Sequence, residues 1–260
     1  MNIVSDFHSH ISRSSAIQMV EAARDKGLPI LGLSEHDFEM HEIRPMLQDL
    51  PLEGPLMGLA DYVEAVQSAA RKLRFDARLG MEVDFIPSKN EGIQALLKGQ
   101  PWDFLIGSVH EVDGEFFESD RLHWPQEEGQ ARWLRYMELL REAVRSGSFS
   151  LVSHPVRMYR RNQYVPPKLD EELERLAAEA TACNVALEIN GYDVLHYPDI
   201  VRRLARACAL HQTPMSVGSD AHRPADVAQG QAQTAALLRE ADIRTVRTWK
   251  QGAIEDYQVS

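Results

Sequence analysis

The segment Asn2-Ile3-Val4-Ser5-Asp6-Phe7-His8-Ser9-His10 is a short apolar strand pattern that ends in two histidines at a spacing of two. Alternate residues of a strand share one face, so Asp6, His8 and His10 are expected to point the same way. Two imidazole groups that converge on one point can bind a metal ion, and a neighbouring carboxylate can orient one of the rings. The pair could equally be two ordinary histidines near a chain end, so its meaning depends on the other histidines.

Seven segments of the chain have the short apolar runs that predict buried strands, and helical periodicity fills most of the chain between them. The predicted strands cover residues 2–10, 29–34, 78–85, 102–110, 149–155, 184–190 and 214–222. The predicted helices cover residues 16–26, 59–73, 90–99, 130–145, 169–182, 200–210 and 234–240. Residues 38–58, a possible lid, and 111–129 are expected to be irregular loops, and the chain end to hold a possible short strand. This alternation predicts an α/β protein with a parallel sheet or barrel.

Side chains that suit a metal ion lie at the carboxyl ends of the predicted strands, and in a parallel barrel these ends meet at one mouth. Six of the 10 histidines lie there, together with a glutamate and an aspartate. The candidate ligands are His8, His10, His36, Glu82, His110, His154, Asp220 and His222. The sequence therefore predicts a metal centre at this mouth, although any single histidine could merely cap its strand.

The candidate ligands indicate both the metal and the chemistry. Imidazole and carboxylate ligands without cysteine suit zinc, manganese or iron. Eight ligands are too many for one tetrahedral ion, so two or three divalent ions are expected, with Glu82 central enough to bridge a pair. Two ions about 3.5 to 4 Å apart can hold a nucleophile for attack on phosphorus. Arg157, Arg160 and Arg161 follow His154 and are either forked donors for a phosphate group or an exposed basic loop.

Composition excludes several other classes of protein. The 260 residues are 44% hydrophobic, which suits one large α/β barrel or two small domains. The net charge of −11 disfavours nucleic acid as the main partner. No apolar run approaches the roughly 18 residues of a membrane helix, and Cys183 and Cys208 have no paired spacing. We therefore expect a cytoplasmic protein that binds no membrane, and the two-ion chemistry above adds a small-molecule phosphoester as its expected partner.

In their order and spacing the motifs resemble the polymerase and histidinol phosphatase (PHP) superfamily. They are Asp6-Phe7-His8-Ser9-His10, Ser34-Glu35-His36, Gly80-Met81-Glu82-Val83-Asp84, Ile106-Gly107-Ser108-Val109-His110, Ser153-His154-Pro155, Leu187-Glu188-Ile189-Asn190 and Gly218-Ser219-Asp220-Ala221-His222. Gly107 to His110 followed by Val112-Asp113-Gly114, and the run 187–222, look most like the monofunctional histidinol phosphatases. The resemblance implies that residues 1–260 form a single PHP-type domain with a distorted (β/α)7 TIM-like barrel.

The resemblance also implies how the ligands are shared among ions. One ion would be held by His8, His10, Glu82 and Asp220, a second by Glu82, His110 and His154, and a third by His36 and His222. The chain departs from the family at residues 11–16, where an expected histidine is absent, and at Glu35, where aspartate is usual. The third site is therefore expected to be weak, completed by water or empty.

By the same resemblance the expected activity is hydrolysis of L-histidinol phosphate, a step of histidine biosynthesis. The expected catalytic residues are Asp220, through proton transfer, and His222. The phosphate-binding arginine would be Arg157 or Arg160, with Arg160 favoured, and Asn190 is a further substrate-binding candidate. The alternatives are another phosphoester, an amidohydrolase-like metal hydrolase, and a non-catalytic metal-binding module. The amidohydrolase is disfavoured because Glu82 takes the bridging place and no lysine follows a predicted mid-chain strand.

Overall fold

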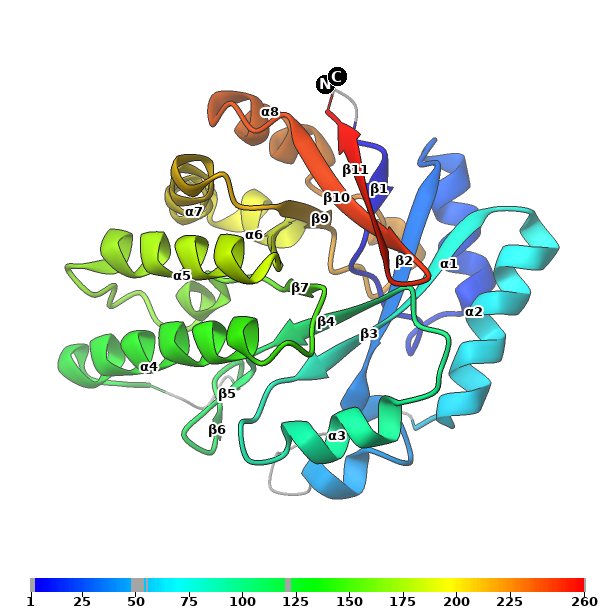
Figure 1. Ribbon diagram of the computed structural model, residues 1–260, viewed down its shortest axis with the longest axis horizontal. Helices are drawn as coiled ribbons and strands as arrows, with labels where there is room; N and C mark the ends of the chain where they lie inside the picture. The colour runs from blue at the N-terminus through cyan, green and yellow to red at the C-terminus, as the bar shows by residue number, and fades with distance from the viewer. Residues whose placement is uncertain (1–2, 48–53, 55, 120–122, 260) are drawn as a thin grey trace.

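A parallel seven-stranded sheet forms the centre of this computed structural model (Figure 1). The structure describes residues 3–47, 54, 56–119 and 123–259. The strands, in their order across the sheet, are β1 (Ser5–Asp6), β2 (Ile30–His36), β3 (Asp76–Asp84), β4 (Phe104–Ser108), β7 (Leu151–Val152), β8 (Ala186–Asn190) and β9 (Met215–Gly218). Each lies within or overlaps a predicted strand. Every neighbouring pair in this sheet is parallel, so the expected parallel arrangement is confirmed.

The two edge strands of the sheet approach each other and nearly close it into a barrel. The N–H group of Phe7, just after β1, donates to the carbonyl group of Val217 in β9 at 2.9 Å. Ser9 and Ala221 pair just beyond these strands. Because β1 and β7 are only two residues long, the barrel is irregular. This is the distorted (β/α)7 TIM-like barrel that the motifs implied.

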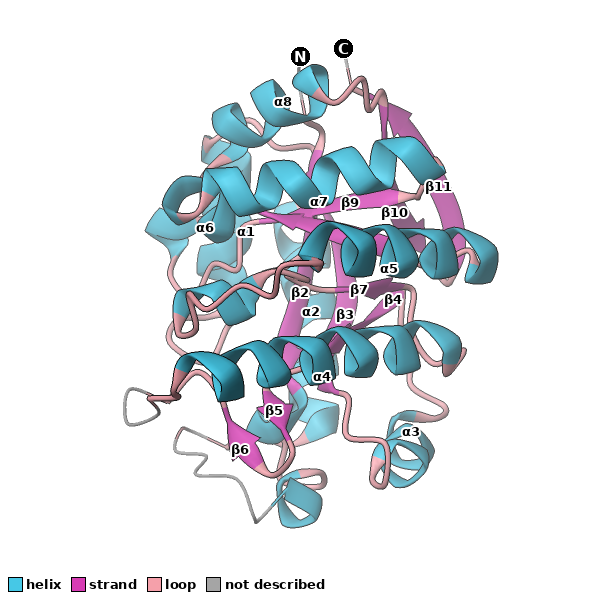
Figure 2. Ribbon diagram, turned by 90° about the vertical axis from the view of Figure 1, so that its left-hand side faces the viewer, coloured by secondary structure: helices cyan, strands magenta, loops and turns pink. Residues whose placement is uncertain are grey.

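Helices cover the outside of the barrel. They are α1 (Ala16–Asp25), α2 (Leu59–Leu73), α3 (Asn90–Leu97), α4 (Gln126–Arg145), α5 (Leu169–Cys183), α6 (Gly191–His196), α7 (Pro198–His211) and α8 (Gln231–Glu240). Helices α4, α5 and α7 lie side by side along one flank (Figures 1 and 2). Helix α4 buries Trp133, Met137 and Leu140, a spacing that places all three on one face. In the described part of the chain no helix is long and apolar enough to cross a membrane.

A hairpin formed by β10 (Thr245–Lys250) and β11 (Ala253–Gln258) crosses the barrel at the amino-terminal ends of its strands (Figure 1). The N–H group of Gln251, in the turn, donates to the carboxylate of Asp103 at 2.6 Å, and Asp103 directly precedes β4. Gln251 and Gly252 have φ values of 51° and 75°, which a two-residue hairpin turn requires. The sequence predicted only a possible short strand here.

Aromatic side chains fill the barrel beneath the metal ligands. Trp249 of the hairpin lies 5.8 Å from Phe7 and 6.3 Å from Phe104, measured between ring centroids, and Phe7 and Phe104 are 4.7 Å apart. Gly80 leaves the space that Phe104 occupies, because a Cβ atom there would lie 2.3 Å from the ring. The interior of the amino-terminal half of the barrel is thus a packed hydrophobic floor, and the predicted metal ligands lie at the opposite end.

The two irregular segments hold more structure than the sequence predicted. Residues 111–129 begin with a small hairpin, β5 (Glu111–Val112) and β6 (Glu115–Phe116), and helix α4 starts at Gln126 rather than at residue 130. In residues 38–58 the backbone forms short 3-10 turns, including Arg44–Leu47. Residues 48–53, 55 and 120–122 lie outside the described residues, so the possible lid at 38–58 stays a prediction.

Candidate metal centre

The eight predicted ligands converge at the carboxyl-terminal mouth of the barrel. Their ligand atoms form three groups, and within each group all atoms lie within 4.8 Å of one another. The groups are His8, His10 and Glu82; Glu82, His110 and His154; and His10, His36 and His222. Asp220 adjoins the first group, since its Oδ1 is 3.3 Å from Nε2 of His10 and 3.8 Å from Nε2 of His8. The eight residues predicted as ligands from the sequence therefore lie close together in the fold.

Glu82 lies at the middle of these groups and faces five imidazole rings. Its Oε1 is 3.2 Å from Nε2 of His8, 3.1 Å from Nε2 of His154 and 3.7 Å from Nε2 of His110. Its Oε2 is 2.7 Å from Nδ1 of His36 and 3.7 Å from Nε2 of His10. Although burial opposes the charge, His8 and His36 hold the pKa of Glu82 well below its usual range. An ionised carboxylate with both oxygens directed at imidazoles can bridge two ions.

Three of the rings are oriented by carboxylates on their far side. The pairs are Nδ1 of His8 with Glu188 at 2.9 Å, Nδ1 of His10 with Glu35 at 3.3 Å, and Nδ1 of His110 with Asp84 at 2.6 Å. A ring that donates its Nδ1–H to a carboxylate presents the Nε2 lone pair to a metal ion. The sequence did not assign this role to any of the three carboxylates, although all three lie within the quoted motifs.

Buried atoms without hydrogen-bond partners test whether these residues fit metal ions. Among the described residues, Nε2 of His8 and Nε2 of His10 have no such partner, and Nδ1 of His36 and Oε2 of Glu82 have none besides their 2.7 Å approach to each other. Leaving one such buried atom unpaired costs about 1 to 3 kcal/mol. Imidazole nitrogen and carboxylate oxygen are the donors that zinc, manganese and iron accept. The residues therefore fit the expected divalent ions.

The pKa values of the His10 and His110 rings are raised by the carboxylates that lie close to them. Burial lowers the pKa of His10, but Asp220, Glu35 and Glu82 outweigh it and raise that pKa to about 9. Burial is likewise outweighed at His110, mainly by Asp84, which raises its pKa to about 10. Protons therefore occupy both rings near neutral pH when no ion is bound.

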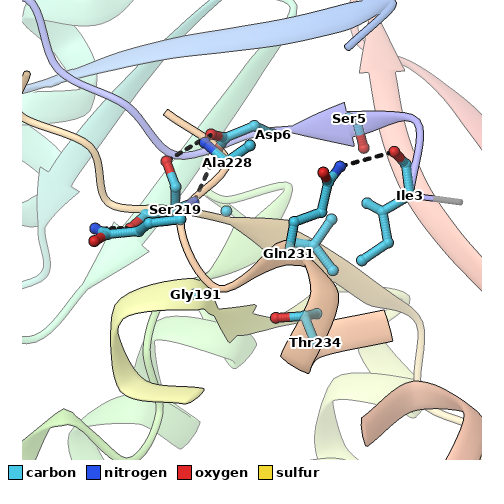
Figure 3. Close-up of a pocket in the computed structure, with 11 residues that line it drawn as sticks. Ile3, Ser5, Asp6, Gly191, Ser219, Ala228, Gln231 and Thr234 are labelled. Carbon is cyan, nitrogen blue, oxygen red and sulfur yellow. Dashed lines mark hydrogen bonds between the residues drawn. The ribbon is translucent and has the colours of Figure 1, made fainter. Parts of the chain in front are cut away.

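Asp6 does not orient a histidine ring, contrary to the expectation from the first strand. Its carboxylate accepts hydrogen bonds from the N–H group of Ser219 at 2.8 Å, the hydroxyl of Ser219 at 2.5 Å and the N–H group of Ala228 at 2.9 Å (Figure 3). The contacts tie β1 to the segment after β9, where Asp220 has a φ of 58°. Since the N–H group of Asp220 also donates to the carbonyl of His8 at 2.8 Å, β1 fixes the backbone of this ligand from two sides.

The predicted arginines have different surroundings. Arg157 is buried and donates to Asp193 at 2.8 Å, Asp220 at 2.7 Å and Glu118 at 3.3 Å. The Arg160 side chain is 31% exposed, donates to Glu118 at 2.9 Å and lies over the ring of Tyr192. Arg157 is therefore hydrogen-bonded to three carboxylates, whereas Arg160 retains accessible donors. The sequence did not identify Glu118, Asp193 or Tyr192.

Two of the predicted substrate-binding residues, Asn190 and Arg161, do not line the cavity described next. Asn190 is buried, and its Oδ1 accepts hydrogen bonds from the N–H groups of Tyr192 and Asp193 while its Nδ2 donates to Glu188. It therefore caps helix α6 and supports Glu188. Arg161 is half-buried and lies outside the lining of the cavity described next.

A cavity opens at the mouth beside the metal ligands. Its wall includes His36, His110, Asp220 and His222 with the cations Arg13, Arg157, Arg160 and Arg223, the carboxylates Glu39, Glu118 and Asp226, and the rings of Phe38, Phe116 and Tyr192. Groups of both charges and aromatic rings thus face one space. Such a wall suits a small molecule that carries both a phosphate and a cationic group.

A parallel α/β barrel whose mouth gathers buried histidines around a glutamate defines a metal-dependent hydrolase. The PHP domain family matches residues 5–191 of the chain. A Deinococcus radiodurans protein described as a probable histidinol-phosphatase is 30% identical over 226 residues, which are 83% of this chain and 85% of that protein. The chain belongs to the PHP domain family, as its motifs indicated.

Solved structures share the fold. The histidinol phosphate phosphatase of Lactococcus lactis, complexed with zinc, L-histidinol and phosphate, has a TM-score of 0.79 and 18% identity over 96% of this chain and 98% of that chain. A chain of an archaeal ribonuclease P with mature tRNA has a TM-score of 0.51 and 11% identity over 92% of this chain and 87% of that chain. At these identities the likeness concerns the barrel itself.

Proposed function

We propose that the protein is a metal-dependent phosphomonoesterase that hydrolyses L-histidinol phosphate to L-histidinol and phosphate, a step of histidine biosynthesis. The observation that carries this proposal is the group of imidazoles around Glu82 at the wall of a cavity that Arg160 also lines. The relative described as a probable histidinol-phosphatase supports the substrate, as does the related fold that binds zinc, L-histidinol and phosphate.

The proposed ligands fall into the three groups of the metal centre. His8, His10, Glu82 and Asp220 would hold one divalent ion, and Glu82, His110 and His154 would hold a second. His36 and His222 would hold a third ion, and His10 lies close enough to complete this group. Because the chain lacks one histidine that is usual in the family, this third site is proposed to be weak, completed by water or empty. When bound, zinc, manganese or iron ions lower the pKa of water and offset charge on the phosphoryl oxygens.

The surrounding side chains bind the substrate and move protons. Arg160 binds the phosphate group, because its guanidinium borders the cavity and keeps accessible donors. Arg157 positions Asp220: it donates to Oδ2 of Asp220, which leaves Oδ1 directed at His8 and His10, while Nη1 of Arg157 faces Glu118 at the cavity wall. Asp220 and His222 are the proposed catalytic residues, since both border the cavity where a proton must reach the leaving oxygen.

The cavity wall also suits the rest of this substrate. L-Histidinol carries an ammonium group and an imidazole ring, and the wall offers the carboxylates of Glu39 and Asp226 and the rings of Phe38 and Phe116. A carboxylate pairs with an ammonium group, and an aromatic ring stacks on an imidazole. These contacts favour an amino-alcohol phosphate over a neutral sugar phosphate.

Phosphate release from a panel of phosphomonoesters tests the proposal, with the purified protein loaded separately with zinc, manganese or iron. A clear preference for L-histidinol phosphate is expected. Preference for another phosphoester would change the substrate, and amide hydrolysis without phosphatase activity would indicate an amidohydrolase. Metal binding without any hydrolysis would indicate a non-catalytic module. The cytoplasmic location and the lack of a nucleic-acid partner stay predictions, and the net charge of −11 supports the latter.

A further inference from the structure

One carboxylate at the cavity wall connects the two arginines. Glu118 follows strand β6, and its Oε1 lies 3.3 Å from Nη1 of Arg157 while its Oε2 lies 2.9 Å from Nη1 of Arg160. Two guanidinium groups therefore direct one donor each at the two oxygens of the same anion. A phosphate group presents a similar pair of oxygens and carries more charge.

The Glu118 carboxylate also lies next to the metal centre. Arg157, which it contacts, is hydrogen-bonded through Nη2 to Asp220, a member of that centre. Arg157, His110 and Arg160 are close enough that their positive charges lower the pKa of Glu118 despite its burial. Glu118 lines the same cavity as His110, Asp220 and His222, and this is the cavity in which the phosphate group of a substrate is proposed to bind.

We propose that Glu118 occupies the phosphate site between Arg157 and Arg160, and that a phosphate group binds by displacing this carboxylate. The inference rests on the proposed function, because it assumes that the cavity receives a phosphomonoester. Glu118 then sets the affinity of the site: it weakens the binding of the substrate's phosphate group and of the phosphate product.

Glu118 is not needed to hold the arginines in place. Arg157 keeps hydrogen bonds to Asp193 and Asp220 when Glu118 leaves, and Arg160 keeps its contact with the ring of Tyr192. The Glu118 side chain is 17% exposed, compared with 10% for Asp220 and 1% for Asp193. Of the three carboxylates around Arg157, Glu118 can therefore move into solvent most easily.

Titration of the metal-loaded protein with inorganic phosphate, followed by calorimetry, tests the proposal. Glu118→Gln keeps the size of the side chain and removes the charge that competes with phosphate, so the Kd for phosphate is expected to fall about tenfold. Glu115→Gln is the matched control, because Glu115 lies in β6 and pairs with Arg132 at 3.0 Å outside the cavity lining. The Kd of Glu115→Gln for phosphate is expected to equal that of the unaltered protein.

The proposal would be overturned if Glu118→Gln bound phosphate as tightly as the unaltered protein, or more weakly. It would also be overturned if neither of these two proteins bound phosphate. A second titration introduces Glu118→Gln into a protein that already carries Arg160→Gln. The fall in the Kd for phosphate is expected to be smaller there, because the contact between Glu118 and Arg160 is already lost. Thermal denaturation verifies that each variant folds, and Glu118→Ala replaces the glutamine variant if it does not. The titration needs no turnover, so failure of the phosphatase proposal in the substrate panel is a separate result.

Discussion

The carboxylate of Glu188 accepts a hydrogen bond from Nδ1 of His8 at 2.9 Å, and both side chains are fully buried. Its second oxygen accepts from the backbone N–H group of His154 at 2.8 Å. Glu188 belongs to none of the three ligand groups, yet it fixes a ring from the first strand and the backbone of a ligand after β7. The orientation of the metal centre therefore depends on a carboxylate that lies behind it.

Replacing Glu188 with glutamine is expected to weaken metal binding by about 10- to 100-fold, because the charge that holds the His8 ring is lost. Competition with a chromophoric chelator measures the affinity. Glu174→Gln, on the exposed face of helix α5, is the control and is expected to bind metal normally. Equal affinities in the two variants would contradict the orienting role of Glu188.

Asp220→Asn is expected to lower kcat by about 10²- to 10⁴-fold, because the amide can neither carry a proton nor supply the same negative charge. His110→Ala is expected to cause a loss of similar size by removing a ligand next to Glu82. Steady-state kinetics with saturating metal measure both effects, and circular dichroism verifies folding. Near-normal turnover in either variant would refute the assigned site.

The two arginines are expected to respond differently to replacement by glutamine. Arg160→Gln should raise KM by about 10- to 100-fold with little change in melting temperature, because it removes charged donors at the edge of the cavity. Arg157→Gln leaves the buried Asp193 without its charged partner and removes one of the partners of Asp220, so it should destabilise the fold by about 3 to 5 kcal/mol. Kinetics and chemical denaturation distinguish the two, and the reverse pattern would exchange the assigned roles.

Metal affinity is expected to rise with pH from about pH 6 to pH 9. The pKa values of about 9 for His10 and about 10 for His110 mean that both rings carry protons near pH 7 before an ion binds. An ion must displace these protons, so it binds more tightly as the pH rises and fewer protons remain. Calorimetry in two buffers of different ionisation enthalpy counts the released protons. Binding that releases no proton at pH 7 would contradict this expectation.

Gly218→Ala is expected to damage the metal centre without adding any polar group. A Cβ atom at this position would lie 2.3 Å from Cβ of His8 and 2.3 Å from Oε1 of Glu188. Overpacking of this kind costs about 1 to 3 kcal/mol, and here it pushes the ring and its carboxylate apart. Thermal denaturation and metal titration should show both effects, whereas an unchanged metal affinity would mean that β9 can shift to make room.

The metal ligands could be predicted from the sequence because each follows a short apolar run, and parallel strands place the residues that follow them at a common mouth. His36 and Glu82 illustrate this, since they face each other in the register of β2 and β3. The partners of charged groups could not be predicted in the same way. Glu118 comes from a segment without periodicity, and only the folded chain shows that it meets two arginines some 40 residues further on.

The residue types in a turn could have predicted the β5–β6 hairpin, which the strand and helix periodicity did not indicate. Asp113 and Gly114 have φ values of 52° and 84°, and an Asp-Gly pair between short apolar runs is typical of a tight hairpin. The β10–β11 hairpin was harder to predict, because Gln251 is an uncommon residue in such a turn. Arg161 follows the Ser153-His154-Pro155 motif and Asn190 lies within another motif, and neither lines the cavity, because chain position does not determine which way a side chain points. Their part in substrate binding stays a prediction.

The floor of the barrel is expected to govern when the metal centre can form during folding. Phe7, one residue before the first ligand, packs against Trp249, and its backbone pairs with Val217. Contacts that join residues so far apart in the chain close late, because a long loop must first be ordered. The first histidines to be synthesised are therefore expected to be among the last to reach their final positions, and loading with metal should follow completion of the barrel.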